Sequence, residues 1–182
     1  MSAKRVGRNQ GLVHLYTGAG KGKTSAAWGL ALRAAGHGKR VKVIEFIKGP
    51  RLTGEHLAAE RLGRLVSVEV CGIGFCRGRD PQRLRKHREC AAGALAAATR
   101  ALASGRWDVV VLDEAAGAAC LGLIGAAELV CAVRARTPGV EVVITGRGAP
   151  RELRRAADYL TEMRAVRHPY ARGVGAREGI EF

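Results

Sequence analysis

A glycine-rich stretch near the N-terminus constrains the fold of this chain more than any other feature. Residues 17–24 read Thr-Gly-Ala-Gly-Lys-Gly-Lys-Thr, between an apolar run at 12–16 and a helix-like run at 25–32. Glycines let backbone N–H groups turn inward around an anion, and the following helix adds its free N-terminal N–H groups and positive dipole end. A strand, a glycine loop ending in Lys-Thr and a helix, in this order, predict a phosphate-binding P-loop.

The side chains and the length of this loop refine that prediction. Lys23 supplies a mobile charge for phosphate oxygens, and the Thr24 hydroxyl is placed to bind magnesium. The usual pattern has a glycine five residues before the Gly-Lys pair, but Thr17 occupies that position and the first glycine is Gly18. The loop is therefore one residue short, which suits a phosphate held in a different orientation. The alternative is an ordinary glycine-rich turn between a strand and a helix.

A second signal lies at residues 107–114, Trp-Asp-Val-Val-Val-Leu-Asp-Glu. This run predicts a buried parallel strand with Asp113 and Glu114 at its carboxyl end, the form of a Walker B element. We expect this strand beside the P-loop strand, so that a carboxylate reaches magnesium directly or through water. The alternative is that the two acids cap the following helix.

The remaining pattern alternates between strands and helices. Strands are expected at 41–47, 65–70, 140–145 and 159–163, and helices at 53–62, 80–105 and 150–158. The apolar window 115–133 predicts a buried turn and a helix. This alternation indicates an α/β fold with a mostly parallel sheet and right-handed crossovers.

Two loops carry further candidates for ligand contact. Lys48 follows the strand at 41–47, and ligands of open α/β sheets bind at such carboxyl ends. An exposed loop lysine is the alternative. Phe75 is the one large aromatic of a flexible loop at 71–79, where it either contacts a ligand or packs on the core.

Length, charge and cysteine usage bound the class of protein. The 182 residues suffice for one α/β domain, expected at 11–182 after a short basic tail at 1–10. Thirty-one Lys and Arg against 16 Asp and Glu give a net charge of +15, but aromatic residues are few and nucleic acid is not expected as a partner. Five cysteines without a C-x-x-C pair indicate free thiols and a cytoplasmic location, and no segment predicts a membrane partner.

Several short motifs follow one another in a fixed order along the chain. They are 17–24, Glu-Phe-Ile-Lys-Gly at 45–49, Thr-Gly-Glu at 53–55, Gly-Phe at 74–75, Val-Leu-Asp-Glu at 111–114, Ile-Thr-Gly-Arg-Gly at 144–148, and 173–182. Together they resemble the P-loop class of ATP:corrinoid adenosyltransferases. The resemblance runs from about residue 11 to the end, and the short P-loop and the C-terminal Gly-Ile-Glu-Phe are its most specific marks.

The resemblance implies a RecA-like P-loop fold, usually a homodimer, and an unusual reaction. A reduced Co(I) corrinoid attacks the 5′ carbon of ATP, which forms a cobalt–carbon bond and releases triphosphate. ATP lies reversed in such a loop, with its γ-phosphate in the usual α position, and the short loop fits this. The implied co-substrate, cofactor and substrate are ATP, Mg²⁺ and the corrinoid, and a flavoprotein or another reductant is an implied partner.

The resemblance also assigns roles to residues. Lys23 and Phe75 are the expected catalytic residues, and Thr24, Asp113 and Glu114 are the expected magnesium ligands. The nucleotide is expected to contact Gly18, Ala19, Gly20, Lys21, Gly22, Lys23, Thr24, Ser25, Lys48 and Arg147.

The chain departs from the family pattern at two places. Arg77 stands where members often have tryptophan, and Ala115 and Ala116 follow the acidic pair in place of a branched and a polar residue. Three other functions remain open from the residues: a conventional P-loop ATPase or kinase, a corrinoid carrier or regulator without turnover, and a nucleotide-gated nucleic-acid binder.

Overall fold

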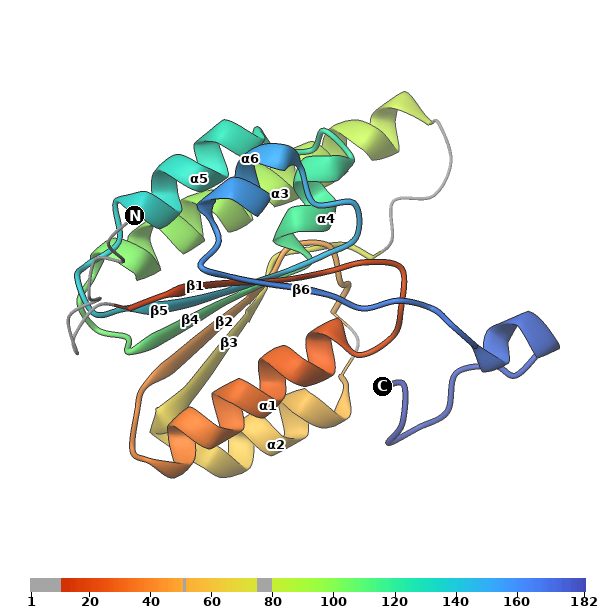
Figure 1. Ribbon diagram of the computed structural model, residues 1–182, viewed down its shortest axis with the longest axis horizontal. Coiled ribbons are helices and arrows are strands. Elements are labelled where there is room, and N and C mark those ends of the chain that lie inside the picture. Colours follow the sequence, from red (N-terminus) through yellow and green to blue (C-terminus); the bar gives the residue numbers. More distant parts are fainter. Residues whose placement is uncertain (1–10, 51, 75–79) are drawn as a thin grey trace, which may run out of the picture.

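The computed structural model of the chain describes residues 11–50, 52–74 and 80–182, which fold around a single parallel sheet (Figure 1). Its strand order is β3-β2-β4-β5-β1-β6, and every neighbouring pair is parallel. The strands are β1 (Val13–Thr17), β2 (Val41–Glu45), β3 (Val66–Val70), β4 (Val109–Asp113), β5 (Glu141–Thr145) and β6 (Tyr159–Glu162). This all-parallel sheet with helices on both faces confirms the predicted α/β, RecA-like class.

The expected neighbour of the P-loop strand was wrong. β1 pairs with β5 and β6, and β4, which carries Asp113 and Glu114 at its end, pairs with β2 and β5. β5 therefore separates the two motif-bearing strands. The sequence of a buried strand reports its burial on both faces, but it carries no information about which strand lies beside it.

Helices cover both faces of the sheet (Figure 1). One face carries α1 (Lys23–Gly36) and α2 (Gly54–Leu62), and the other carries α3 (Pro81–Ala103), α4 (Ala115–Cys120), α5 (Ala126–Arg134) and α6 (Arg151–Ala156). Short 3₁₀ turns lie at Gly63–Leu65 and Pro169–Arg172. The window 115–133 forms two helices where a turn and one helix were predicted.

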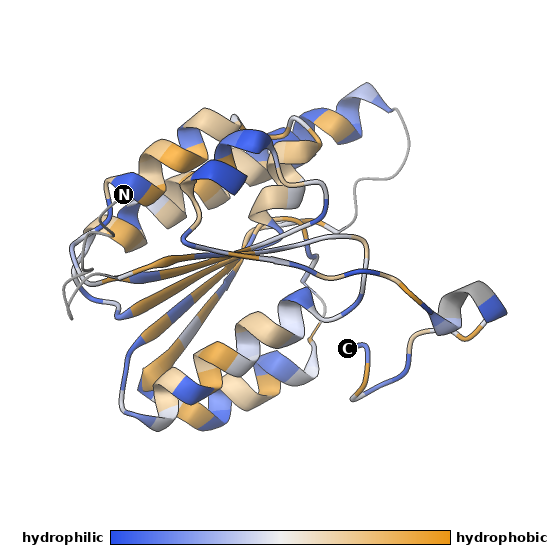
Figure 2. Ribbon diagram, viewed as in Figure 1, coloured by the Kyte–Doolittle hydropathy of each residue, from blue (hydrophilic) through white to orange (hydrophobic). Residues whose placement is uncertain are grey.

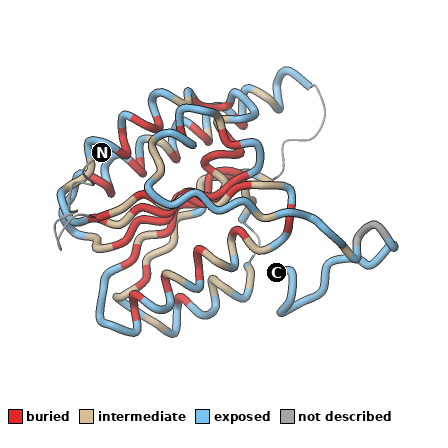
Figure 3. The backbone as a smooth tube through the Cα atoms, viewed as in Figure 1, coloured by how far each residue is buried: buried red, intermediate tan, exposed pale blue. Residues whose placement is uncertain are grey.

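Alternate residues of the central strands feed two separate cores. Val110 and Leu112 of β4 point into the core beneath α3 and α5, whereas Val109 and Val111 point into the core beneath α1. The central strands are mostly apolar, and the buried residues concentrate on the sheet and on the inner faces of the helices (Figures 2 and 3). Burial on both faces explains why these strands read as continuous apolar runs.

The N-terminal part of α3 starts as the sequence predicts. Asp80 is its N-cap and accepts a hydrogen bond from the Gln82 N–H at 3.1 Å, and Pro81 occupies the first helical position. Alanines at 91, 94 and 98 are fully buried, which lets this long helix lie close to the sheet.

Because the strands are all parallel, the carboxyl ends of β1, β2, β4 and β5 lie at one edge of the sheet, where ligands bind in open α/β sheets.

Removing a core side chain from the P-loop strand tests this packing. Leu15 in β1 is fully buried, whereas Leu32 on α1 is 58% exposed. We expect Leu15→Ala to lower the free energy of unfolding by about 2–5 kcal/mol, because it leaves a cavity, and Leu32→Ala to change it by less than about 0.5 kcal/mol. Urea denaturation of both variants measures the difference, and equal midpoints would contradict the assignment of Leu15 to the core.

Candidate functional site

A cavity of about 910 Å³ opens at the carboxyl edge of the sheet, beside the P-loop. The P-loop, the loop after β2, the start of α2, α4 and the C-terminal segment all contribute to its wall. Its lining residues are Gly20, Lys21, Gly22, Lys23, Thr24, Ser25, Trp28, Ile47, Lys48, Gly54, Glu55, Ala58, Glu114, Gly117, Cys120, Leu121, Arg147, His168, Gly179, Ile180, Glu181 and Phe182.

Most of the candidate residues from the sequence meet at this cavity. The P-loop from Gly20 to Ser25 lines it together with Lys48, Glu114 and Arg147, while Asp113 lies beneath it. Gly18 and Ala19 are not among its lining residues. Phe75 lies outside the described residues, together with Arg77.

The glycines of the P-loop also permit close contact with the chain that follows β6. A Cβ at Gly18 would lie 2.4 Å from the Met163 carbonyl oxygen, and the Gly20 N–H donates to that same oxygen at 2.7 Å. Gly18 and Gly22 have φ values of 97° and 112°, which side-chain-bearing residues rarely adopt. The loop is therefore held from behind by β6 while its front faces the cavity.

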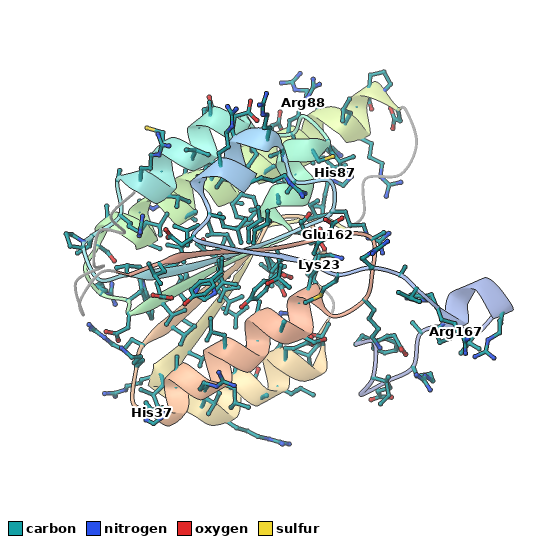
Figure 4. The ribbon with its side chains drawn as sticks, in the orientation of Figure 1. Lys23, His37, His87, Arg88, Glu162 and Arg167 are labelled. Atoms are coloured by element: carbon teal, nitrogen blue, oxygen red, sulfur yellow. The ribbon has the colours of Figure 1, made fainter. Side chains whose placement is uncertain are left out.

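Lys23 lies at the start of α1, near one edge of the sheet (Figure 4). Its Nζ donates to the carbonyl oxygens of Gly18 at 2.8 Å and Gly20 at 2.7 Å. Burial, and then the positive charge of Arg147, lower the pKa of Lys23. An ammonium has three donors, so a phosphate oxygen can bind the remaining one or replace a carbonyl.

Asp113 is fully buried, and its carboxylate joins three segments of the chain. Oδ1 accepts hydrogen bonds from the Thr24 hydroxyl at 3.0 Å and the Thr145 hydroxyl at 2.6 Å, and Oδ2 pairs with Lys48 Nζ at 2.9 Å. The Thr145 oxygen in turn accepts a hydrogen bond from the Glu114 N–H at 2.9 Å. Thr145 lies on β5, the strand between β4 and β1, and its hydroxyl thus links the Asp113 carboxylate to the Glu114 backbone.

Glu114 presents its carboxylate to the cavity from a left-handed backbone conformation with φ 59°. It is the N-cap residue of α4 but forms no side-chain capping bond, so the capping alternative is wrong for this residue. A Cβ at Gly117 would lie 2.7 Å from Glu114 Oε2, so the glycine leaves room for the carboxylate. Burial, and then the neighbouring Asp113 charge, raise the pKa of Glu114.

The donor set suits a hard divalent cation that shares its ligands with a polyphosphate. Thr24 and Glu114 offer oxygen atoms to the cavity, and Asp113 lies behind them. Within the described ranges, no group of three or more His, Cys, Asp and Glu side chains is placed to hold a metal. Magnesium binds through one or two carboxylates plus substrate phosphates, so these residues fit a magnesium ion that arrives with a nucleotide.

Lys48 is paired with two carboxylates. Its Nζ lies 2.9 Å from Asp113 Oδ2 and 3.4 Å from Glu45 Oε1. Burial by itself lowers the pKa of Lys48, but the charges of Asp113 and Glu45 outweigh burial and raise this pKa to about 12. The side chain is therefore a fixed positive charge at the rim of the cavity.

The C-terminal segment is the part of the site that residue patterns alone did not indicate. It returns to the P-loop (Figure 1), where Lys21 Nζ lies 2.7 Å from Glu181 Oε1 and 3.2 Å from the Ile180 carbonyl oxygen. Arg177 also binds Glu181 through its backbone N–H at 2.8 Å and its Nε at 3.2 Å. The resemblance marked this segment as characteristic, but no local signal places it against residues 160 positions away.

Trp28 and α4 were also missed as parts of the cavity wall. Trp28 lies one helical turn after Thr24, so its position four residues on from the threonine predicted to bind magnesium was the available signal. Gly117 and Cys120 belong to α4, an alanine- and glycine-rich helix that carries no chemical motif, and Leu121 is its C-cap.

Among the described residues, every helix is too short or too polar to span a lipid bilayer.

Comparison with known proteins gives a consistent result. A sequence model of the family described as ATP:corrinoid adenosyltransferase BtuR/CobO/CobP matches residues 9–182. The chain is 38% identical over 173 residues to the corrinoid adenosyltransferase of Pseudomonas aeruginosa, covering 95% of this chain and 84% of that protein. It is 38% identical over 177 residues to the corrinoid adenosyltransferase CobA of Salmonella typhimurium, covering 95% and 86%. It is 34% identical over 180 residues to a corrinoid adenosyltransferase of Sinorhizobium sp., covering 95% and 81%.

The contact between Lys21 and Glu181 can be tested by limited proteolysis. Hydrogen bonds from Arg177 and Lys21 lower the pKa of Glu181 to about 2, so the carboxylate stays charged, and the contact persists, until the pH falls towards that value. We expect Glu181→Gln to release the segment, so that trypsin cleaves after Arg172 and Arg177 faster than in the unchanged protein. Mass spectrometry of the released peptides measures the rate.

Glu178→Gln is the matched control, because it makes the same chemical change three residues earlier. Its carboxylate takes part in no ion pair among the described residues. Equal cleavage rates in the Glu181→Gln variant and the unchanged protein would show that Glu181 does not hold the segment.

Proposed function

The chain belongs to the ATP:corrinoid adenosyltransferase family, and on that premise we propose how its residues divide the reaction among themselves. It is an enzyme that transfers an adenosyl group from ATP to a corrinoid. In the reaction that we propose, the 5′-deoxyadenosyl group moves to a reduced corrinoid and triphosphate leaves. The observation that carries the proposed roles is the single cavity shared by a short P-loop, Lys48, Glu114 and Arg147.

The P-loop binds the triphosphate of ATP in this proposal. The loop at 18–24 and the N-terminus of α1 offer backbone N–H groups to the phosphates, apart from the Gly20 N–H, which donates to the Met163 carbonyl oxygen. Ser25 continues the first turn of the helix. Lys23 exchanges its contacts with the Gly18 and Gly20 carbonyls for phosphate oxygens, and Lys21 and Arg147 add positive charge at the rim. The electrostatic contribution of these residues is to stabilise the negative charge that develops on the leaving triphosphate.

Thr24 and Glu114 would hold Mg²⁺ when it binds with the nucleotide, and Asp113 orients the Thr24 hydroxyl by accepting its hydrogen bond. The contacts of Asp113 support this assignment of roles, because its carboxylate oxygens already accept hydrogen bonds from two hydroxyls and pair with Lys48. The bound ion supplies further stabilisation of negative charge on the leaving group.

The chemical step needs no protein base. The Co(I) centre donates an electron pair to C5′ of ATP, the C5′–O bond breaks, and that bonding pair leaves with the triphosphate oxygen. Cobalt goes formally from +1 to +3 in this step. Because the reaction starts from Co(I), an external reductant, a flavoprotein or another donor, must first generate that state. The chain contributes positioning of C5′ and exclusion of water and oxidants.

Three further parts of the proposal concern assembly, location and the role of Phe75. A homodimer is supported by β6, an edge strand whose Tyr159 and Leu160 are 52% and 45% exposed. A cytoplasmic enzyme is supported by the free cysteines of the described chain at 71, 90, 120 and 131. Phe75 is proposed to contact the corrin, as the family resemblance implies.

An anaerobic assay tests the proposed reaction. ATP, magnesium and a chemically reduced Co(I) corrinoid are mixed with the enzyme, and the visible spectrum and released phosphates are followed. We expect a light-sensitive alkylcobalt spectrum and one triphosphate per adenosylated corrinoid. ADP and phosphate without triphosphate would identify a conventional ATPase, and corrinoid binding without triphosphate would identify a carrier.

Lys23→Met tests the electrostatic role of the P-loop lysine. We expect kcat to fall about 10²- to 10³-fold, because a preorganised charge aimed at the developing negative charge is lost. The control is Lys39→Met, an exposed lysine beyond the far end of α1, which should leave kcat unchanged. A Lys23→Met enzyme that retained full kcat and lost only affinity for ATP would assign Lys23 to ground-state binding alone.

A further inference from the structure

Behind the cavity lies a buried polar cluster whose members Glu45 and His56 have no part in the mechanism proposed above. Glu45 ends β2 and is fully buried, and His56 lies in the first turn of α2 with 12% of its side chain exposed. Neither residue lines the cavity. A buried carboxylate is costly unless it is paired, and an apolar residue of similar volume is often as stable or more stable at such a site.

Glu45 is placed against Asp113 by the register of the sheet. The two residues are direct partners on the parallel strands β2 and β4, so their side chains leave the sheet on the same face. Two ionised carboxylates in these positions repel each other. Lys48 Nζ lies between them, 3.4 Å from Glu45 and 2.9 Å from Asp113, and cancels that repulsion.

The hydrogen bonds of His56 define its tautomer. The Thr53 backbone N–H can only donate, and it lies 3.2 Å from His56 Nδ1, so Nδ1 is the unprotonated acceptor. The proton of the neutral ring is therefore on Nε2, which donates to Glu45 Oε2 at 3.2 Å. His56 thus caps α2 with one nitrogen and orients Glu45 with the other.

These contacts form one continuous chain from α2 to the metal-binding threonine. It runs from His56 through Glu45, Lys48 and Asp113 to Thr24. We propose that Glu45 and His56 are positioning residues for the reaction: they hold Lys48 against Asp113, which keeps Lys48 off the phosphates and fixes Thr24 for magnesium. The inference rests on the proposed division of roles among Thr24, Asp113 and Glu114.

Changing Glu45 should therefore affect magnesium and triphosphate in opposite directions. Without the Glu45 charge, the Lys48 ammonium loses one of its two carboxylate partners, so it is held less firmly against Asp113 and its positive charge is less completely balanced beside the cavity. Inorganic triphosphate without metal should then bind as well or better, by Coulomb attraction. Magnesium triphosphate should bind more weakly, because Thr24 and its partners lose their support. A variant that was merely less folded would bind both ligands less well.

The first experiment is calorimetric titration of Glu45→Gln with inorganic triphosphate, once with EDTA and once with Mg²⁺. We expect the affinity for magnesium triphosphate to fall about 10- to 100-fold, the usual effect of losing a partner behind a metal ligand, and the affinity with EDTA not to fall. The matched control is Glu69→Gln on the adjacent strand β3. The Glu69 carboxylate lies 2.9 Å from Lys42 Nζ, and neither of these residues lines the cavity. It should change neither affinity.

Two His56 variants separate the orienting role from the helix cap. His56→Gln places an amide N–H near the position of Nε2 and keeps a donor for Glu45, whereas His56→Asn places a carbonyl near Nδ1 and keeps the acceptor for Thr53. We expect the Gln variant to bind magnesium triphosphate like the unchanged protein and the Asn variant to bind it severalfold more weakly. The reverse order would show that His56 acts only through α2.

The outcomes distinguish this inference from the proposed reaction. The titrations use no corrinoid, so an enzyme that made no alkylcobalt product could still show the opposite changes in the two affinities. Equal affinities for magnesium triphosphate in Glu45→Gln and the unchanged protein would overturn the positioning role, even in an active adenosyltransferase. A parallel loss with and without magnesium would overturn it as well, because it would indicate a general loss of structure.

Discussion

The buried carboxylate of Asp113 is the interaction on which the rest of the site depends. It connects β4 to α1 through Thr24, to β5 through Thr145 and to the loop after β2 through Lys48. The Thr145 hydroxyl is fully buried and would lose its acceptor without Asp113, the Thr24 hydroxyl would lose the contact that orients it, and Lys48 would keep only Glu45. Removing Asp113 would therefore disturb three segments at once, which costs more than the loss of any single hydrogen bond.

This arrangement explains how two adjacent acidic residues take different positions. Asp113 ends β4 with its side chain directed into the polar cluster, whereas the left-handed backbone of Glu114 turns the next carboxylate into the cavity. Thr145 supports both, because its hydroxyl donates to Asp113 and accepts from the Glu114 N–H. One strand end thus supplies a fixed internal anchor and an accessible carboxylate with a raised pKa.

The sequence predicted the parts of the site whose signals are local. The P-loop, the acidic pair and the N-cap of α3 each depend on spacings of a few residues, and the parallel sheet follows from alternating strands and helices. The neighbour of β1 was predicted wrongly, because the paired residues of β1 and β5, such as Val13 and Val142, are 129 positions apart, and long-range pairing leaves no trace in a single apolar run. The series of side-chain contacts from His56 through Glu45 to Lys48 was not predicted for a related reason, because it depends on the register of β2 and β4.

The positioning of Lys48 also bears on why a P-loop fold can perform an alkyl transfer. In a phosphoryl-transfer enzyme, positive charge gathers on the phosphoryl group that is transferred. In the proposed reaction the leaving group is the whole triphosphate and the reacting atom is a carbon, so a positive charge that does not contact the triphosphate has no developing negative charge to stabilise. Two carboxylates that hold Lys48 at the rim would leave Lys23 and the loop N–H groups as the main positive field, directed at the triphosphate.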